Sequence, residues 1–152
     1  MKKLRILIIF LSLALMAIAC KDENDPVSEE NIQLEKLSST WVATEVTKDE
    51  IGDGGYDNFR LILSGNPESQ VFTYAVIGRP EMSPWLAGGT WRFGSQVSSQ
   101  IVRDPGTVDE VQITYTLSET TLTLEFNFTG EGYPNGRTES LEGTYRFTLQ
   151  KQ

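Results

Sequence analysis

Apolar and polar residues alternate along the second half of the chain. Val111, Ile113, Tyr115 and Leu117 share one parity, and glutamine and threonine residues fill the positions between them. Successive side chains on a β-strand point to opposite faces, so this period of two predicts a strand with one buried and one solvated face. The same period recurs at Leu122, Leu124, Phe126 and Phe128, and again at Tyr145, Phe147 and Leu149.

From residue 37 onward, short runs rich in threonine, valine and aromatic residues are separated by glycine, proline, asparagine and aspartate. This texture is typical of successive antiparallel strands. We predict eight strands, at 40–48, 58–63, 71–77, 89–93, 99–103, 110–117, 121–128 and 141–150. A sheet with one buried face must fold over or close on itself, and short connections favour closure. The pattern therefore predicts an all-β domain over 37–152, an eight-stranded antiparallel up-and-down barrel.

The first nineteen residues have a different pattern. Lys2, Lys3 and Arg5 precede an apolar run over 6–18, and small residues follow, which is the layout of a cleaved secretory signal peptide. The run of about thirteen residues is shorter than the roughly twenty that a membrane-spanning helix needs. We therefore expect 1–19 to be removed and the mature chain to contain no transmembrane helix.

The only cysteine, Cys20, follows this segment directly in "LMAIAC". This stretch resembles the bacterial lipobox, where the cysteine thiol receives a diacylglyceryl group and the signal is cut just before it. The resemblance implies a lipidated Cys20, and two or more acyl chains hold a protein firmly on a membrane. The alternatives are an ordinary signal peptide with a chance cysteine nearby, or a free thiol in the core.

The residues after the cysteine resemble a second targeting signal. Lys21, Asp22 and Glu23 in "CKDEND" resemble the export signal of surface lipoproteins of the Bacteroidetes. The resemblance implies an outer-membrane lipoprotein on the cell surface, with a periplasm-facing location as the alternative. The acidic stretch 20–36 lacks a sustained apolar period, so we expect a flexible tether that ends in at most one helical turn.

Composition narrows the function. Removal of 1–19 takes away three basic residues and no acidic one, which lowers the net charge from -8 to -11. Nucleic-acid binding depends on lysine and arginine, so we expect none. The chain has no histidine, which argues against His-based triads and ordinary zinc sites. We expect a non-catalytic monomer without cofactor or metal, although a glycosidase-like carboxylate pair could arise by chance among 21 acidic residues.

Four stretches resemble the lipocalin-like, calycin-type lipoproteins of the Bacteroidetes. They are "STW" with the preceding Leu37, "GGTWRF" at 88–93, "LSETTLTLEF" at 117–126 and "LEGTYRFTLQK" at 141–151. Ser39 occupies a position where this family usually has glycine. The resemblance covers about 115 residues and implies a lipocalin-like barrel that binds a small apolar ligand.

The candidate ligand-binding residues are the aromatic side chains that we expect inside the barrel or at its mouth. An eight-stranded barrel is just wide enough to be filled by its own side chains or to hold one small ligand, so a packed core is the alternative. A filled barrel would leave recognition of a protein or glycan to the loops. The candidates are Phe72, Tyr74, Trp85, Trp91, Phe93 and Tyr145.

Two connections between the predicted strands contain further candidate binding residues. The stretch 78–89 has an apolar tip at Met82, Trp85 and Leu86, and Trp85 can either touch a ligand or partner or fold back to plug the barrel. The stretch 48–58 is rich in carboxylates around a Gly-Gly turn. Its spacing lacks the EF-hand order, so a solvated turn is favoured over a calcium site.

Overall fold

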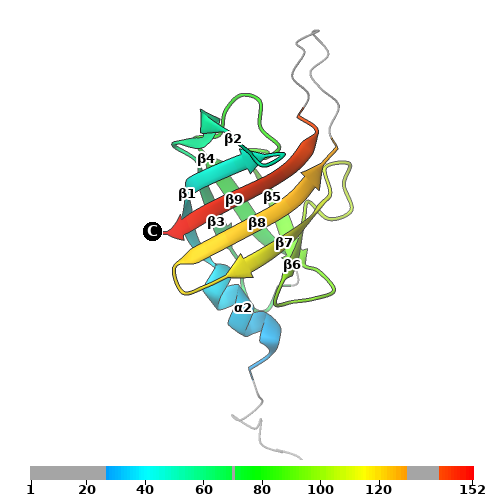
Figure 1. Ribbon diagram of the computed structural model, residues 1–152. Helices are drawn as coiled ribbons and strands as arrows, with labels where there is room; N and C mark the ends of the chain where they lie inside the picture. Colours follow the sequence, from blue (N-terminus) through cyan, green and yellow to red (C-terminus); the bar gives the residue numbers. More distant parts are fainter. Residues whose placement is uncertain (1–26, 70, 130–140) are drawn as a thin grey trace, which may run out of the picture.

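The computed structural model describes residues 27–69, 71–129 and 141–152, and these fold into a closed antiparallel β-barrel (Figure 1). Strand β1 pairs with β3 on one side and with β9 on the other, which closes the sheet. The predicted all-β, eight-stranded up-and-down barrel is therefore confirmed, with one additional short strand, β2. The elements are α2 (Glu29–Leu37), β1 (Ser39–Lys48), β2 (Ile51–Gly52), a 3-10 turn η2 (Gly54–Tyr56), β3 (Arg60–Ser64), β4 (Phe72–Ile77), β5 (Gly88–Phe93), β6 (Gln100–Arg103), β7 (Val111–Leu117), β8 (Thr121–Phe128) and β9 (Gly143–Lys151).

Strand β2 lies in the stretch that we predicted as an acidic turn. It forms a tight hairpin with β1, in which Lys48 pairs with Ile51. The two residues of the hairpin turn, Asp49 and Glu50, have φ angles of 51° and 67°. Two consecutive residues with a left-handed backbone conformation are typical of a two-residue hairpin turn. Asparagine and glycine are the usual residues in such a turn. The absence of those residues hid this hairpin from the sequence prediction.

The folded part begins earlier than predicted. Residues that we assigned to the end of the tether form helix α2, which Ser28 caps by accepting a hydrogen bond from the Asn31 amide at 3.2 Å. Leu34 and Leu37 of this helix are buried in the core. The helix is short and only these two residues anchor it, so its apolar period was too brief to recognise. It covers one end of the barrel (Figure 1).

The barrel has two distinct ends. At the α2 end lie the helix, the C-terminal residue Gln152, the described residues 65–69 after β3 and the connections 94–99 and 118–120. At the opposite end, here called the distal end, lie the connections 49–59, 78–87 and 104–110 and the pairing of Phe128 with Gly143. Up-and-down topology makes this division, because each strand reverses the direction of the one before it.

Candidate functional site

The six predicted ligand-binding side chains lie inside the barrel, as part of its hydrophobic core. Each is at most 6% exposed. Their rings contact one another, with centroid distances of 4.8 Å between Phe72 and Trp91 and 5.3 Å between Trp91 and Phe93. The structure thus brings the predicted residues together, and they fill the interior with side chains as the packed-core alternative requires. They are Phe72, Tyr74, Trp85, Trp91, Phe93 and Tyr145.

Trp85 acts as the plug of the distal end. The connection 78–87 folds back into the barrel, so that Trp85 is only 1% exposed. Its ring centroid lies 5.6 Å from that of Tyr74 and 5.8 Å from that of Phe126, in edge-to-face arrangements. Such contacts stabilise beyond simple area burial. Of our two alternatives for Trp85, the structure shows the one in which it folds back, and Leu86 is exposed in its place.

A buried charge pair lies beneath this plug. Arg103 is 1% exposed, and its guanidinium carbon lies 4.9 Å from the Trp85 ring centroid. Its Nη1 donates a hydrogen bond to the Pro84 carbonyl at 2.8 Å, which fastens the plug loop to β6. Burial lowers the pKa of Arg103, against opposing interactions with Tyr74 and Asp104. Sequence reasoning missed this residue, although it shares the inward parity of Ile101 on the same strand.

Asp104 joins the cluster from the end of β6, with a φ angle of 50°. Its Oδ2 accepts a hydrogen bond from the Tyr74 hydroxyl at 2.7 Å, and its Oδ1 accepts one from the Thr90 amide at 3.0 Å. Burial, followed by the bond to this carboxylate, raises the pKa of Tyr74. The cluster thereby ties β4, β5 and β6 together at the distal end. Buried charges survive only when they are paired and bonded in this way.

Two donors in this cluster are not satisfied by the described part of the chain. The indole Nε1 of Trp85 is buried without a hydrogen-bond partner, and so is Nε of Arg103. The latter lies 3.4 Å from Asp104 Oδ2, close enough for an ion pair but without hydrogen-bond alignment. Unmet buried donors carry a desolvation cost of about 1–3 kcal/mol each.

A hollow of about 720 Å³ opens at the distal end, between the β1–β2 hairpin and the plug loop. Tyr145 is the one predicted ligand-binding residue that reaches it, and burial followed by the charges of Asp53 and Asp49 raises its pKa to about 12. The hollow mixes apolar and charged groups. It is lined by Lys48, Asp49, Ile51, Gly52, Asp53, Gly54, Pro80, Met82, Leu141 and Tyr145.

Carboxylates of the acidic stretch 48–58 bind backbone amides. Asp49 Oδ1 accepts from the Thr144 amide at 2.8 Å, and Asp53 Oδ1 accepts from the Gly55 amide at 3.1 Å. Within 27–69, 71–129 and 141–152, no three histidine, cysteine, aspartate or glutamate residues gather closely enough to hold a metal ion. The favoured turn interpretation agrees with these bonds.

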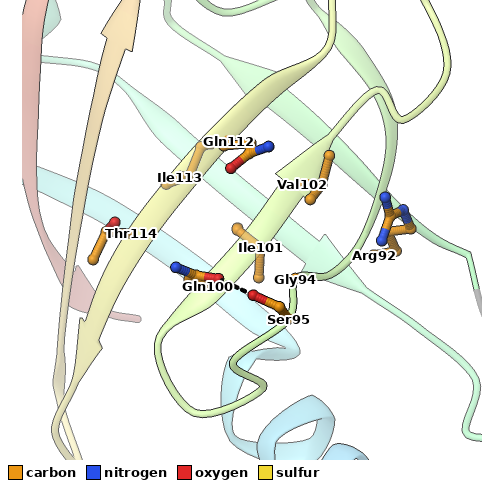
Figure 2. Close-up of a pocket in the computed structure, with 9 residues that line it drawn as sticks. All are labelled: Arg92, Gly94, Ser95, Gln100, Ile101, Val102, Gln112, Ile113 and Thr114. Atoms are coloured by element: carbon orange, nitrogen blue, oxygen red, sulfur yellow. Dashed lines mark hydrogen bonds between the residues drawn. The ribbon is translucent and has the colours of Figure 1, made fainter.

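A second hollow, of about 380 Å³, lies on the outer side of the barrel across β5, β6 and β7 (Figure 2). Sequence reasoning did not indicate it, because most of its residues face outward and lie on three different strands or in the loop between two of them. It is lined by Arg92, Gly94, Ser95, Gln100, Ile101, Val102, Gln112, Ile113 and Thr114.

The predicted anchor and export residues, Cys20, Lys21, Asp22 and Glu23, lie outside the described residues. In the part of the chain that the structure does describe, no helix has the length and apolar character needed to span a membrane.

The sequence matches no protein-family model, and comparison with curated proteins gives no significant match.

Proposed function

We propose that this protein is a lipid-anchored, non-catalytic binding module that recognises a protein partner through the distal end of a solid barrel. The observation that carries the proposal is the contrast between a filled interior and exposed apolar side chains at the distal end. Val108 is fully exposed and Ile51 is 73% exposed, and Ile77 at the end of β4 and Leu86 in the plug loop are exposed at the same end. Binding residues are disproportionately found on loops that a rigid scaffold positions.

The anchor is Cys20, with Lys21, Asp22 and Glu23 as the signal for the cell surface and a periplasm-facing location as the alternative. The proposal is supported by the resemblance of these stretches to a lipobox and to an export signal of Bacteroidetes lipoproteins. Residues 21–28 span at most about 30 Å when extended. Since this short stretch leads into α2, the α2 end faces the membrane and the distal loops face outward.

The anchor is tested with Cys20→Ser, Lys21→Ala and the doubly substituted Asp22→Ala, Glu23→Ala protein. We expect Cys20→Ser to leave the chain uncleaved or released from the membrane. The two export variants should stay lipidated but lose accessibility to protease added to intact cells. Normal acylation and surface display in all three would contradict this part of the proposal.

Partner binding is tested by photo-crosslinking on cells from a photoreactive residue placed at position 108, with Leu86 and Ile51 each replaced by lysine in turn. We expect a discrete crosslinked product that weakens in the Leu86→Lys and Ile51→Lys proteins. Ile32→Lys is the matched control, because Ile32 is an exposed apolar residue at the α2 end. A product that survives the distal substitutions, or that Ile32→Lys removes equally, would contradict distal recognition.

A second candidate function is supported by the unmet donors under the plug. If the plug loop swings out, Trp85 leaves an interior lined by aromatic residues, and Arg103 loses its contact with the Trp85 ring and its bond to Pro84 but keeps the Phe126 ring beside it. The uncovered cation would then favour an apolar ligand with an acidic head group. A lipocalin-like resemblance points to the same ligand class.

This carrier function is tested with a fluorescent fatty acid and a fluorescent amine of the same tail. A carrier would bind the acid in preference to the amine, and the Trp85→Ala protein would bind it more tightly. Failure of both probes with both proteins would remove the carrier function and leave the solid-barrel proposal intact.

A further inference from the structure

The hollow on the outer side of the barrel has a floor that the strand register explains (Figure 2). Arg92, Val102 and Gln112 stand opposite one another on β5, β6 and β7. Their neighbours Phe93, Ile101 and Ile113 are buried in the core, so these three side chains point outward. A short side chain between two long ones leaves a depression. Val102 forms its apolar base, only 6% exposed although it is not part of the core cluster.

A glycine extends the depression toward the α2 end. In the next outward row, Gly94 donates its amide to the Gln100 carbonyl at 2.9 Å, and Gln100 pairs with Thr114. A Cβ atom at Gly94 would lie 2.8 Å from the Gln100 Cβ, closer than real contacts allow. The missing side chain therefore lets the Gln100 amide group lie across this part of the hollow.

Three of the polar side chains around the hollow, those of Arg92, Ser95 and Gln100, are held in place by hydrogen bonds. Ser95 Oγ donates to Gln100 Oε1 at 2.9 Å, so the amide nitrogen of Gln100 keeps its two donors for another partner. Arg92 Nη1 donates to the Phe93 carbonyl at 3.2 Å, and the remaining guanidinium donors stay available. Donors fixed on strands of a rigid scaffold lose little entropy on binding. The lining thus offers more donors than acceptors.

Its charge also differs from the rest of the molecule. Arg92 is the only charged residue among the described residues that line this hollow, while the whole chain has a net charge of -8. The distal hollow, in contrast, is lined by two carboxylates, Asp49 and Asp53, and one cation, Lys48. A ligand for the outer hollow must supply acceptors, and an anionic acceptor best matches the guanidinium.

We propose that this outer hollow binds a saccharide that carries a carboxylate or sulfate group. The acidic group lies against Arg92, hydroxyl groups exchange hydrogen bonds with Gln100, Gln112 and Thr114, and an apolar ring face packs on Val102. A peptide fits less well, because the apolar base is a single valine and provides no pocket for a large side chain. The site is separate from the distal end and does not depend on the function proposed there.

The test uses the full-length lipoprotein in detergent, with chondroitin sulfate and galacturonate oligosaccharides as probes. Maltohexaose is the neutral control and polyglutamate is the anionic peptide control. Binding is measured by calorimetry at two salt concentrations, and hydrogen exchange locates the protected segments. We expect the acidic saccharides to bind and to protect 92–102 and 112–114.

The decisive variant is Arg92→Gln, which keeps a polar side chain and removes the charge. We expect it to weaken acidic-saccharide binding at least tenfold, and Gln112→Ala to weaken it severalfold. Arg60→Gln is the matched control, because Arg60 is an exposed arginine on β3, and Val108→Lys controls for the distal end. Both controls should bind as the unchanged protein does.

Three outcomes would overturn the proposal. They are the absence of binding by every acidic saccharide, an equal loss in Arg92→Gln and Arg60→Gln, and binding of polyglutamate or maltohexaose as strong as that of the acidic saccharides. A distal substitution such as Leu86→Lys that changes partner crosslinking but leaves saccharide binding unchanged would concern the distal end alone.

Discussion

Each end of the barrel is closed by a tryptophan with a cation over its ring, but the two ends are built differently. At the α2 end, Trp41 lies under Lys151 and donates its indole N–H to the Leu37 carbonyl at 2.9 Å. At the distal end, Trp85 lies over buried Arg103 and its indole N–H is unmet within the described chain. The tryptophan at the α2 end has a satisfied indole N–H, although the nearby Ser38 hydroxyl is unmet within the described chain, whereas the distal end holds a desolvated charge.

Backbone conformation follows the same division. In the described ranges, the three non-glycine residues with positive φ are Asp49, Glu50 and Asp104, and all lie at the distal end. Such residues cost about 1–3 kcal/mol each and persist where the surroundings enforce them. The two ends therefore differ in role. The α2 end mainly stabilises the fold, whereas the distal end keeps strained backbone and a buried charge of the kind found at functional sites.

The largest expected effect comes from removing the buried cation. Arg103→Met should destabilise the protein by about 3–5 kcal/mol, because Asp104 then stays buried without its counter-charge. Lys151→Met removes the corresponding cation at the α2 end, where the side chain is exposed, and should cost less than about 1 kcal/mol. Chemical denaturation of both variants measures the difference. Equal costs would show that the two closures are energetically alike.

The two tryptophans are compared directly by replacing each of them, Trp41 and Trp85, with phenylalanine. Trp41→Phe removes a buried hydrogen bond and leaves the Leu37 carbonyl without that donor, whereas Trp85→Phe removes an unmet donor. We expect Trp41→Phe to be more destabilising than Trp85→Phe by about 1–3 kcal/mol. Thermal unfolding at neutral pH, monitored by circular dichroism, measures the difference in stability between the two variants. A larger loss in Trp85→Phe would mean that its indole N–H has a partner in solution.

Alkaline unfolding probes one tyrosine from each end. Burial raises the pKa of Tyr145 at the distal end and of Tyr115 on β7 to about 12, from an ordinary value near 10. A raised folded-state pKa means that the unfolded chain ionises first, so this stability is present below pH 10 and declines as pH rises toward 12. Tyr145→Phe and Tyr115→Phe should each flatten the decline in denaturation series at pH 9 to 12. Parallel curves for the variants and the unchanged protein would contradict this assignment.

The smallest effect concerns the hairpin turn. Glu50→Gly should stabilise the protein by up to about 1 kcal/mol, because glycine adopts a φ of 67° without steric cost. The exposed α2-end substitution Ser28→Ala should act in the opposite direction, by about 1 kcal/mol, through loss of the helix cap. Melting temperatures of the two variants should therefore move apart. A destabilising Glu50→Gly would show that the Glu50 side chain makes a stabilising contact that outweighs its strain.

Much of the barrel could be predicted from the sequence because burial follows the period of two on strands such as β4 and β7. The hairpin strand β2 and helix α2 could not, since two paired residues and two buried leucines leave too short a pattern. Boundaries shifted by one or two residues elsewhere, as at β9, which runs from Gly143 to Lys151.

The candidate site was predictable only as a set of inward aromatic residues. Their packing into a filled core depends on Trp85, whose position is decided by tertiary contacts with Arg103 and Tyr74 that no local pattern encodes. Arg103 is charged although it occupies an inward position, where apolar residues are the rule. Its place in the alternation of the strand was therefore the only sign in the sequence that it is buried. The outer hollow arises from cross-strand neighbours, Arg92, Val102 and Gln112, which are distant in sequence.

Whether the barrel is filled by its own side chains is tested most directly by native mass spectrometry of the protein extracted gently from the cells that make it. We expect the mass of the chain, with the acyl groups proposed for Cys20, and no apolar small molecule bound in the barrel. A stoichiometric apolar adduct that disappears in a Trp91→Leu or Tyr74→Phe protein would contradict this expectation and establish the barrel interior as the binding site.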